Sequence, residues 1–489
     1  MAIIKYVRRK SFFVNTLLIT MIDYILIFGF LGYLAFSSFK SYKEIHSINA
    51  FSMGIRSIST YALGATITAT WVSGSGFVMD LCEFYKEGAS YFISSVGMCL
   101  TLSVVAILVV PKMKRFLGKI SVASIMGEEY GQTVRVITAI SGCFAVSGGI
   151  FIQFKIMGKV LHYLLPFLNE PICIVISSSI VILYSFIGGI NSVVHTDKIQ
   201  AVCFTLALII GIVIIKTTIK YETPSHGLGE HFYPSHLLTF NKEQWIDLIL
   251  LFAYFLIPGM SPHVVQRISM GINLNQVKKA YLWSSLALFL VLIFSCWFAY
   301  LLFQIDPHIP GEKLLTTLLD LFTIDGTKAI VIIGIISMCM STADSNLNIG
   351  AVLFANDLWK KNSLDKLSKL YVARKATILI GVLSLFFAFK EGSLLTIILF
   401  AQSFYMPIVT IPLLAIIFGF KTTERCCLIA MGMTFSYVAI FKLKIYPNFN
   451  IIPPAMLLNA IVLFASHYLI EKKELLKCFG IGSQLKGKK

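Results

Sequence analysis

A group of oxygen-bearing side chains interrupts one of the most apolar stretches of the chain. Residues 337–348 read SMCMSTADSNLN, and the flanking residues are mostly Ile, Met, Val and Leu. On a helix, Ser341, Asp344 and Ser345 share one face, and Thr342 lies about 100° around the axis from Ser341. Two adjacent hydroxyls and a carboxylate one turn away form a hard oxygen site. Such sites suit small alkali cations, and no cluster of His and Cys is present to favour zinc or copper.

Two carboxylates inside apolar segments need an explanation. Ser and Thr in spanning helices often bond only to the carbonyl four residues earlier, but an ionisable residue such as Asp344 is costly in a membrane and by default marks a functional site. The alternatives for Asp344 are a protonated, packed side chain or a pair with a basic residue. Asp197 follows a tight connection at Gly188 and Gly189, and its simplest role is that of an anion in the first turn of the next helix.

The composition indicates where these residues act. The 489 residues are 57% apolar and 13% charged, with a mean hydropathy of +0.82, which is too apolar for a water-soluble domain of this size. The net charge of +17 comes from Lys and Arg in short loops between apolar runs, so it predicts a bilayer as partner and argues against nucleic acid. The ten Cys are scattered without paired spacing, which indicates small core residues.

Apolar runs long enough to cross a membrane recur along the whole chain. We predict thirteen spans, at residues 13–36, 58–86, 89–112, 133–162, 171–190, 194–216, 247–268, 278–304, 327–357, 371–389, 392–420, 424–442 and 449–470. Basic connections fall on one side, which places the C-terminus in the cytoplasm and the N-terminus outside. The basic residues at positions 5–10 would then lie outside, so either the first span is inserted unusually or the count of spans is off by one. The expected location is the plasma membrane, or the inner membrane of a bacterial cell.

Two of the spans are interrupted at matching positions. The second span contains ATWVSGSGF, with Gly74 and Gly76, and the seventh contains FLIPGMSP, with Pro258 and Gly259. Each break opens a set of five spans, and an odd number of spans inverts the second set relative to the first. Matched breaks are the sequence sign of an inverted-repeat transporter whose substrate binds at the breaks. Ordinary kinks are the alternative, since Gly and Pro are common in spanning helices.

This pattern divides the chain into five parts. They are an extra N-terminal span and loop at 1–57, a first repeat at 58–216, an extracellular loop at 217–246, a second repeat at 247–420, and two extra spans with a basic cytoplasmic tail at 421–489. The long loop is either a cover over a pore mouth or a plain solvated connector.

Four motifs, taken in order, resemble the sodium/solute symporter family, which includes sodium/proline, sodium/sugar and sodium/sialic acid transporters. The motifs are SVASIMGEEYGQ, YSFIGGINSVVHTDKIQ, MSTADSNLNIGAVLFANDLWK and AQSFYMPIVTIPLLAIIFGFKTTER. The resemblance covers nearly the whole chain. It implies an all-α polytopic membrane protein with a LeuT-type five-plus-five inverted repeat. It also implies uptake by alternating access, with sodium as a co-transported ion rather than a cofactor. We expect a monomer as the functional unit.

The same resemblance implies two ion sites. The main sodium site would use the backbone carbonyls of Ala69, Val72 and Met338 and the hydroxyls of Ser341 and Thr342. The sialic acid branch has a further site, and its positions here would be Asp197, Ser341, Asp344 and Ser345. With two acids in that set, we expect it to hold a second sodium or a proton.

The solute is predicted only by position. Five polar or aromatic residues lie at mid-membrane depth near the breaks or on candidate facing helices: Trp71, Ser73, Gln153, Tyr254 and Gln402. The two glutamines alternatively make interhelical hydrogen bonds. The stretch SPHVVQR resembles a Pro-His-x-x-x-Arg segment of the proline branch, which favours an amino acid as solute. Trp71 departs from that branch, which has an Asp there.

The expected function is sodium-driven import of a small organic solute, and we expect no enzymatic activity. An intramembrane aspartyl protease would need Tyr-Asp and Gly-x-Gly-Asp contexts, which Asp197 and Asp344 lack. A solute sensor on a transporter fold, which binds its ligand without concentrating it, is the remaining alternative.

Overall fold

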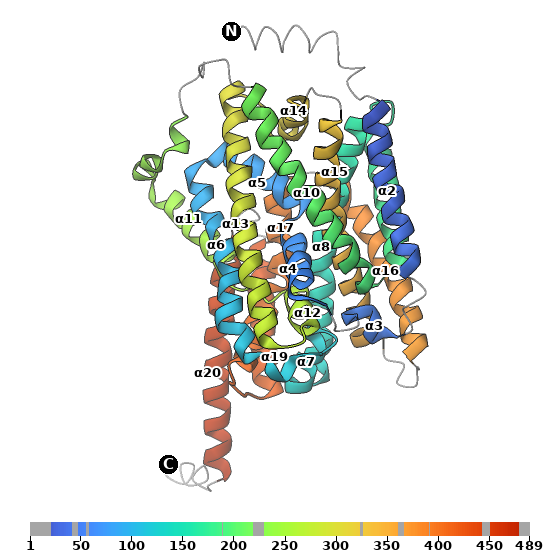
Figure 1. Cartoon of the computed structure of the whole chain (residues 1–489). Coiled ribbons are helices and arrows are strands. Elements are labelled where there is room, and N and C mark those ends of the chain that lie inside the picture. Colours follow the sequence, from blue (N-terminus) through green and yellow to red (C-terminus); the bar gives the residue numbers. More distant parts are fainter. Residues whose placement is uncertain are drawn as a thin grey trace.

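The helices of the chain run side by side through one bundle, with α20 projecting from one end (Figure 1). The computed structural model describes residues 21–41, 47–54, 58–187, 189–218, 229–322, 326–359, 366–390, 392–442 and 450–478, which contain helices and no strand. Within these ranges, nine helices are long and apolar enough to cross a membrane. The other four of the thirteen predicted spans correspond to a shorter apolar stretch of α2, the 17-residue α19, and two spans that are each split into two helices.

Two successive sets of helices follow the two predicted breaks. The first set contains α4 (Thr60–Trp71), α5 (Gly74–Glu87), α6 (Ala89–Val104) with its continuation η2 (Val105–Val109), α8 (Gln132–Leu164), α9 (Glu170–Ile187) and α10 (Ile190–Thr218). The second set contains α11 (Lys242–Leu256), α12 (Pro262–Met270), α13 (Leu274–Ile305), α15 (Thr327–Leu353) with its continuation η8 (Phe354–Leu358), α16 (Lys366–Ala388), α17 (Leu394–Ser403), η9 (Met406–Thr410) and α18 (Ile411–Ile417).

Further helices flank or connect these sets. They are α2 (Met21–Ser41), α3 (Ile48–Met53), α7 (Val122–Tyr130), α14 (Leu314–Asp320), α19 (Glu424–Ile440) and α20 (Ile452–Cys478), with short turns at η3 (Val110–Lys112), η4 (Lys114–Phe116), η5 (Glu230–Phe232), η6 (Pro234–Thr239) and η7 (Gly311–Lys313).

The two sets pack against each other reciprocally. The second helix of each set packs on the broken helix of the other, α6 on α11 and α13 on α4 and α5. The fifth helix of each set packs on the third helix of the other, α10 on α15 and α17 on α8. This exchange is what an inverted repeat requires. In the most apolar window of α15, 94% of the residues are buried, against 28% for α20, so α15 lies at the centre and α20 at the edge.

The first predicted break separates α4 from α5 at Val72 and Ser73. Ser73 Oγ accepts a hydrogen bond from the Gly76 backbone N–H at 2.8 Å, which caps the start of α5. A Cβ atom at Gly74 would lie 2.2 Å from the sulfur of Cys339, so only glycine allows the break to press directly against α15. The break is therefore a junction between the two sets.

The second predicted break separates α11 from α12 at residues 257–261, and Met260 there has a positive φ of 41°. Thr410 Oγ1 donates to the Gly259 carbonyl at 2.6 Å, and the Tyr405 hydroxyl donates to the Met260 carbonyl at 2.8 Å. Backbone groups released by a break inside a membrane must bond to protein or line a cavity. These two carbonyls are bonded by protein.

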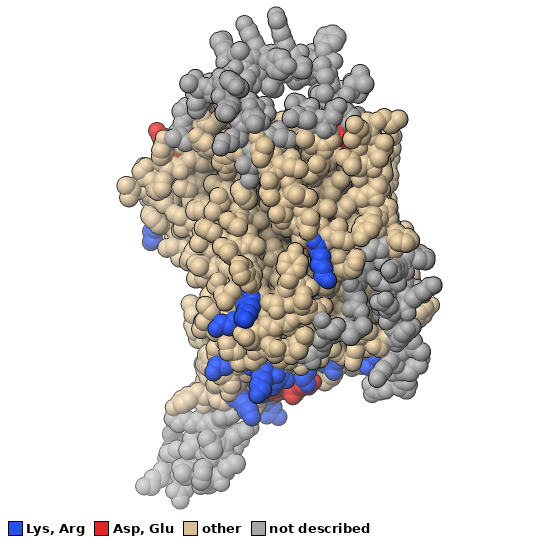
Figure 2. Space-filling view, viewed as in Figure 1, with Lys and Arg blue, Asp and Glu red and all other residues tan. Residues whose placement is uncertain are grey.

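Charge is unevenly distributed along the bundle. Most of the Lys and Arg side chains visible in Figure 2 lie in the half of the molecule that contains the C-terminal end of α20. Cytoplasmic segments of membrane proteins carry this excess of basic residues. The basic residues at positions 5–10, which oppose the predicted topology, lie outside the described residues.

The described part of the loop predicted at 217–246 packs on the bundle. His231 Nε2 lies 3.1 Å from the Tyr85 carbonyl oxygen, and its ring centroid lies 4.9 Å from that of Phe303. Phe232 also contacts Phe303, at 5.2 Å between ring centroids. From residue 229 onward the loop therefore contacts the bundle through aromatic rings.

Candidate functional site

The residues predicted for the main sodium site come from both helix sets. Ala69, Val72 and Met338 are buried, with exposed fractions of 3%, 3% and 4%, and α4 packs against α15. The last carbonyls of a helix have no donor from a following turn. Because α4 ends at Trp71, the carbonyl oxygens around Ala69 and Val72 need partners from outside the helix.

The two hydroxyls predicted for that site have different environments. Ser341 Oγ donates to Asp197 Oδ1 at 2.6 Å. Thr342 is 6% exposed, and its Oγ1 has no hydrogen-bond partner among the described residues. Thr342 also lines a cavity of about 130 Å³ beside the first break. A buried hydroxyl left unpaired costs roughly 1–3 kcal/mol, so this oxygen calls for a water molecule or an ion.

Asp197 is fully buried where three helices meet. It lies about two turns inside α10, so the expectation of an anion in the first helical turn was wrong. Its Oδ1 accepts the Ser341 hydroxyl of α15, and its Oδ2 accepts the Thr66 hydroxyl of α4. Asp197 thereby connects the first and fifth helices of one set to the third helix of the other.

Arg267 of α12 lies in the same cluster, although the sequence prediction did not assign it a role. Its side chain is 1% exposed, and Nη2 donates to Ser345 Oγ at 2.8 Å and to Thr70 Oγ1 at 3.1 Å. The same nitrogen lies 3.8 Å from Asp197 Oδ2. The guanidinium therefore touches two of the four residues predicted for the second ion site. A charged residue within the span that contains SPHVVQR was the available signal.

Asp344 lies near Arg267 but has a different partner. Its Oδ2 accepts the Tyr184 hydroxyl, and its Oδ1 has no hydrogen-bond partner among the described residues. The side chain is fully buried. The cluster thus combines two carboxylates with one guanidinium, and one carboxylate oxygen remains for a further ligand.

The five residues predicted for the solute border two adjoining cavities, of about 130 and 200 Å³. Ser73 and Gln402 line both cavities, Gln153 lines the smaller one, and Trp71 and Tyr254 line the larger one. The residues that line both are Thr70, Ser73, Ser261, His263, Ile398 and Gln402. The cavities therefore form one polar region between the two breaks.

The two predicted glutamines behave differently within this region. Gln153 Nε2 donates to Ser75 Oγ at 2.6 Å, and its Oε1 accepts the Ser75 N–H at 3.1 Å. Its amide therefore makes hydrogen bonds between α8 and α5, as the alternative to a solute contact predicted. Gln402 Oε1 has no partner among the described residues. The cavity also includes His263, whose ring meets Trp71 edge-on at 5.7 Å between centroids.

A further carboxylate, Asp80 of α5, lines the larger cavity and was not predicted. Its Oδ1 accepts the Tyr91 hydroxyl at 2.9 Å, and its side chain is 5% exposed. Asp80 lies inside an apolar span, which is the same signal that drew attention to Asp344.

Two inverted helix sets, each opening with a broken helix, and a polar cavity between the breaks define a secondary transporter with a LeuT-type inverted repeat. The profile of the sodium:solute symporter family matches residues 51–433. The chain belongs to the sodium:solute symporter family, whose members co-transport sodium as a substrate.

Curated relatives agree with this family. The chain is 26% identical over 348 residues to the sodium/sialic acid symporter NanT of Aliivibrio fischeri, covering 67% of this chain and 68% of the relative. It is 22% identical over 361 residues to the high-affinity choline transporter 1 of Caenorhabditis elegans, covering 69% of this chain and 62% of that protein. These relatives do not support the expectation of proline or another amino acid as solute.

A solved structure shows the same fold. The substrate-bound, outward-open structure of a Na⁺-coupled sialic acid symporter superposes with a TM-score of 0.74 at 18% identity, covering 92% of this chain and 97% of the other. The expected five-plus-five helical architecture is confirmed.

Proposed function

We propose that the chain imports a small organic solute together with sodium by alternating access between the two faces of a plasma membrane. The proposal rests chiefly on Thr342. Its buried hydroxyl has no hydrogen-bond partner among the described residues and borders a cavity that is also lined by three of the five predicted solute residues, Ser73, Gln153 and Gln402. The proposal includes a cytoplasmic C-terminus, which is supported by the excess of Lys and Arg in the half of the molecule that contains the end of α20.

In this mechanism sodium connects the two helix sets. The carbonyls of Ala69 and Val72 belong to the first set, and the Met338 carbonyl and the two hydroxyls belong to the second. A cation bound between them favours the conformation in which α4 and α15 are close. Solute that binds beside the same break then favours the same conformation as the ion. Both ligands thus bind this conformation more tightly than the other, and coupling requires this difference in affinity. Each charge moved inward adds about 2.3 kcal/mol per 100 mV of membrane potential.

The second ion site at Asp197, Ser341, Asp344 and Ser345 remains a proposal. Arg267 already places a positive charge against Asp197 and Ser345. A second cation would therefore bind on the Asp344 side of this set, where Oδ1 has no hydrogen-bond partner in the part of the chain that the structure describes.

Thr342→Ala tests the main site. We expect the sodium concentration for half-maximal uptake to rise at least about tenfold in proteoliposomes, because the variant removes a direct ligand; tenfold corresponds to about 1.4 kcal/mol. Protein stability without sodium should change little, since the hydroxyl makes no hydrogen bond to any described residue.

Ser337→Ala is the matched control. Ser337 is also buried on α15, and its hydroxyl also lacks a hydrogen-bond partner within the described ranges. It is one helical turn from Ser341 and outside the predicted site. It should keep the sodium dependence of the unmodified protein. An unchanged sodium dependence in Thr342→Ala, with normal uptake, would remove the basis of the proposed main site.

The sensor alternative predicts a different result. A sensor would bind solute in a sodium-dependent way without concentrating it. Counterflow and concentrative uptake in sealed vesicles, compared with binding to the solubilised protein, separate the two functions. Accumulation above the external concentration, abolished by collapse of the sodium gradient, supports the symporter.

A further inference from the structure

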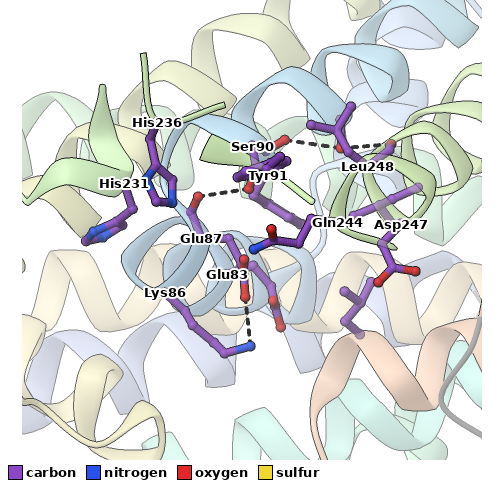
Figure 3. A pocket seen from close by; sticks show the side chains of 14 residues that line it. Glu83, Lys86, Glu87, Ser90, Tyr91, His231, His236, Gln244, Asp247 and Leu248 are labelled. Atoms are coloured by element: carbon purple, nitrogen blue, oxygen red, sulfur yellow. Dashed lines mark hydrogen bonds and ion pairs between the residues drawn. The ribbon is translucent and has the colours of Figure 1, made fainter. Parts of the chain in front are cut away.

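An outer cavity lies beyond the solute region, on the side covered by the loop that precedes α11. Its volume is about 290 Å³. Figure 3 shows that Glu83 and Glu87 of α5, Asp247 of α11, and His231 of the loop line this hollow. Glu83, Lys86, Glu87 and Asp247 are the only Asp, Glu, Lys or Arg among its described lining residues.

The outer cavity carries an excess of negative charge. Three carboxylates face one ammonium group, and that group, Lys86 Nζ, lies 2.8 Å from Glu87 Oε1. Burial lowers the pKa of the His231 imidazole, so this residue adds no positive charge near neutral pH. A concave surface lined by one sign of charge concentrates ions of the opposite sign. This entrance therefore attracts cations and repels anions.

Two helices connect this entrance to the larger of the two cavities between the breaks, which we call the inner cavity. On α17, Leu395 lines the outer cavity, and Ile398 and Gln402 on the same helix face line the inner one. On α11, Leu251 lines the outer cavity and Tyr254 the inner one. The two cavities therefore follow one another along a single route.

Tyr91 and Asp80 lie at the boundary between the outer and the inner cavity. Tyr91 lines the outer cavity, and its hydroxyl donates to Asp80, which lines the inner one. The Tyr91 ring meets Phe84 and Phe255 edge-on, at 5.0 and 6.3 Å between centroids. Phe255 also lines the inner cavity. A solute that passes inward must displace this aromatic layer next to the Asp80 carboxylate.

The inner cavity has the chemistry of a cation site. Among its described lining residues, Asp80 is the only Asp, Glu, Lys or Arg. Trp71, Phe77 and Tyr254 contribute aromatic rings to the same lining. Ammonium groups bind to aromatic faces and to carboxylates, whereas a carboxylate ligand would find no Lys or Arg here.

Two buried oxygens that line the inner cavity have no hydrogen-bond partner among the described residues. They indicate a ligand independently of the charge of Asp80. Thr101 is 1% exposed and lines the inner cavity, and its Oγ1 has no partner among the described residues. Gln402 Oε1, in the same cavity, also has none. A hydroxyl or N–H group on the solute would satisfy them.

We propose that the co-transported solute is a small organic cation, whose ammonium group passes the acidic outer cavity and binds in the inner cavity against Asp80 and the neighbouring aromatic rings. This inference rests on the proposed symport function and specifies its substrate class. The same lining offers no Lys or Arg to the carboxylate of sialic acid or of another anion.

The first experiment compares probes of different charge on the full-length protein. Choline and ethanolamine carry an ammonium group, 3,3-dimethylbutanol is a neutral isostere of choline, and N-acetylneuraminate is an anion. At saturating sodium, we expect thermal stabilisation and sodium-driven uptake with at least one ammonium compound, and at least about tenfold weaker binding of the neutral isostere. Equal binding of the isostere, transport of N-acetylneuraminate, or no response to either ammonium compound overturns the proposal.

These outcomes separate the inference from the function on which it rests. Sodium-driven uptake of N-acetylneuraminate would retain the symporter and refute the cation site. Binding of an ammonium compound without concentrative uptake would retain the cation site and refute the symporter.

Asp80→Asn distinguishes a solute cation from sodium at this carboxylate. We expect the KM for the ammonium compound to rise at least about tenfold, while the thermal stabilisation by sodium alone, measured without solute, stays unchanged. Loss of the sodium stabilisation with an unchanged KM would identify the cation at Asp80 as sodium and overturn the proposal.

Variants of the outer cavity provide a second test that does not alter the buried carboxylate. Glu87→Gln combined with Asp247→Asn should raise the KM a few-fold at low ionic strength and not at high salt, with Vmax unchanged. Glu312→Gln is the matched control, because Glu312 is exposed and lies outside this cavity. A KM that does not change in the double variant contradicts the proposed route.

Discussion

Two oxygen clusters lie next to each other on α15, and their hydrogen bonding differs. Around Thr342, a hydroxyl without a hydrogen-bond partner among the described residues borders a cavity at the end of α4. Around Ser345, the oxygens are bound by Arg267, and Asp197 is joined to Thr66 and Ser341. The first cluster needs a ligand from solution, whereas the second contains a cation that belongs to the chain.

This difference suggests separate roles for the two clusters. A site that exchanges its ion must be incomplete without it, as the Thr342 cluster is. A buried cluster whose members bond to one another instead holds its helices in one arrangement, here α4, α10, α12 and α15. The ionisable groups do not balance, because two carboxylates, Asp197 and Asp344, face one guanidinium. Asp344, which has an unpaired oxygen, is thus the member through which the second cluster could also bind an ion.

The largest effect should come from Arg267→Gln. Removal of one partner from a buried ion pair typically destabilises a protein by about 3–5 kcal/mol, because a charge is left buried without compensation. We expect a strongly lowered unfolding temperature of the detergent-solubilised protein and little or no transport. Combination with Asp197→Asn should recover part of the stability, since the double variant no longer contains the uncompensated carboxylate.

Arg115→Gln is the control for this variant. Arg115 pairs with Glu129 at 3.2 Å near the surface, where side chains are 45% and 26% exposed, and such pairs contribute about 0–1 kcal/mol. If Arg267→Gln is as stable as Arg115→Gln, the second cluster does not hold the helices together.

Much of the fold could be predicted from the sequence, because hydrophobic length and helix breakers act locally. The Gly residues near position 75 and the Pro residues near position 260 locate both breaks within a few residues of the observed helix ends. The reciprocal packing follows from an odd number of spans in each set. The bonding of the second break by Thr410 and Tyr405 could not be predicted, because it depends on a helix some 150 residues away.

The site was predictable only in part, for the same reason. The spacing of Ser341, Thr342, Asp344 and Ser345 shows which residues share a helix face, but not what faces them. Arg267 reaches that face from another helix, so its charge could be seen in the sequence and its partner could not. The sodium assignment itself remains a prediction from the family resemblance and from the unpaired oxygen.

Asp344→Asn should have the next largest effect. The amide keeps the size of the side chain and removes its charge. If Asp344 binds a second ion, the charge carried per solute molecule should fall, or the apparent affinity for sodium should decrease about tenfold. Simultaneous measurement of current and tracer uptake gives this ratio.

Tyr184→Phe serves as its control. This variant removes the hydrogen bond to Asp344 but leaves the carboxylate in place. It should alter stability or affinity without changing the charge per solute. An unchanged ratio and an unchanged sodium affinity in Asp344→Asn would mean that the second cluster is structural only, and the contrast between the two clusters would be complete.

The smallest effect should come from Ser73→Ala at the first break. Ser73 caps α5, and loss of such a cap costs about 1 kcal/mol. Ser73 also lines both cavities between the breaks, of about 130 and 200 Å³, so we expect an additional rise of a few-fold in the KM for solute. Uptake kinetics and unfolding temperature should be measured on the same preparation.

Ser59→Ala separates these two contributions. Ser59 caps α4 by accepting the Ala62 N–H at 3.2 Å, and it lies outside both cavities between the breaks. Loss of this cap should lower stability by a similar amount and leave the KM unchanged. If both variants change the KM equally, the effect of Ser73 is only that of a helix cap. The first break would then position the site through its backbone alone, without a side-chain contact to the solute.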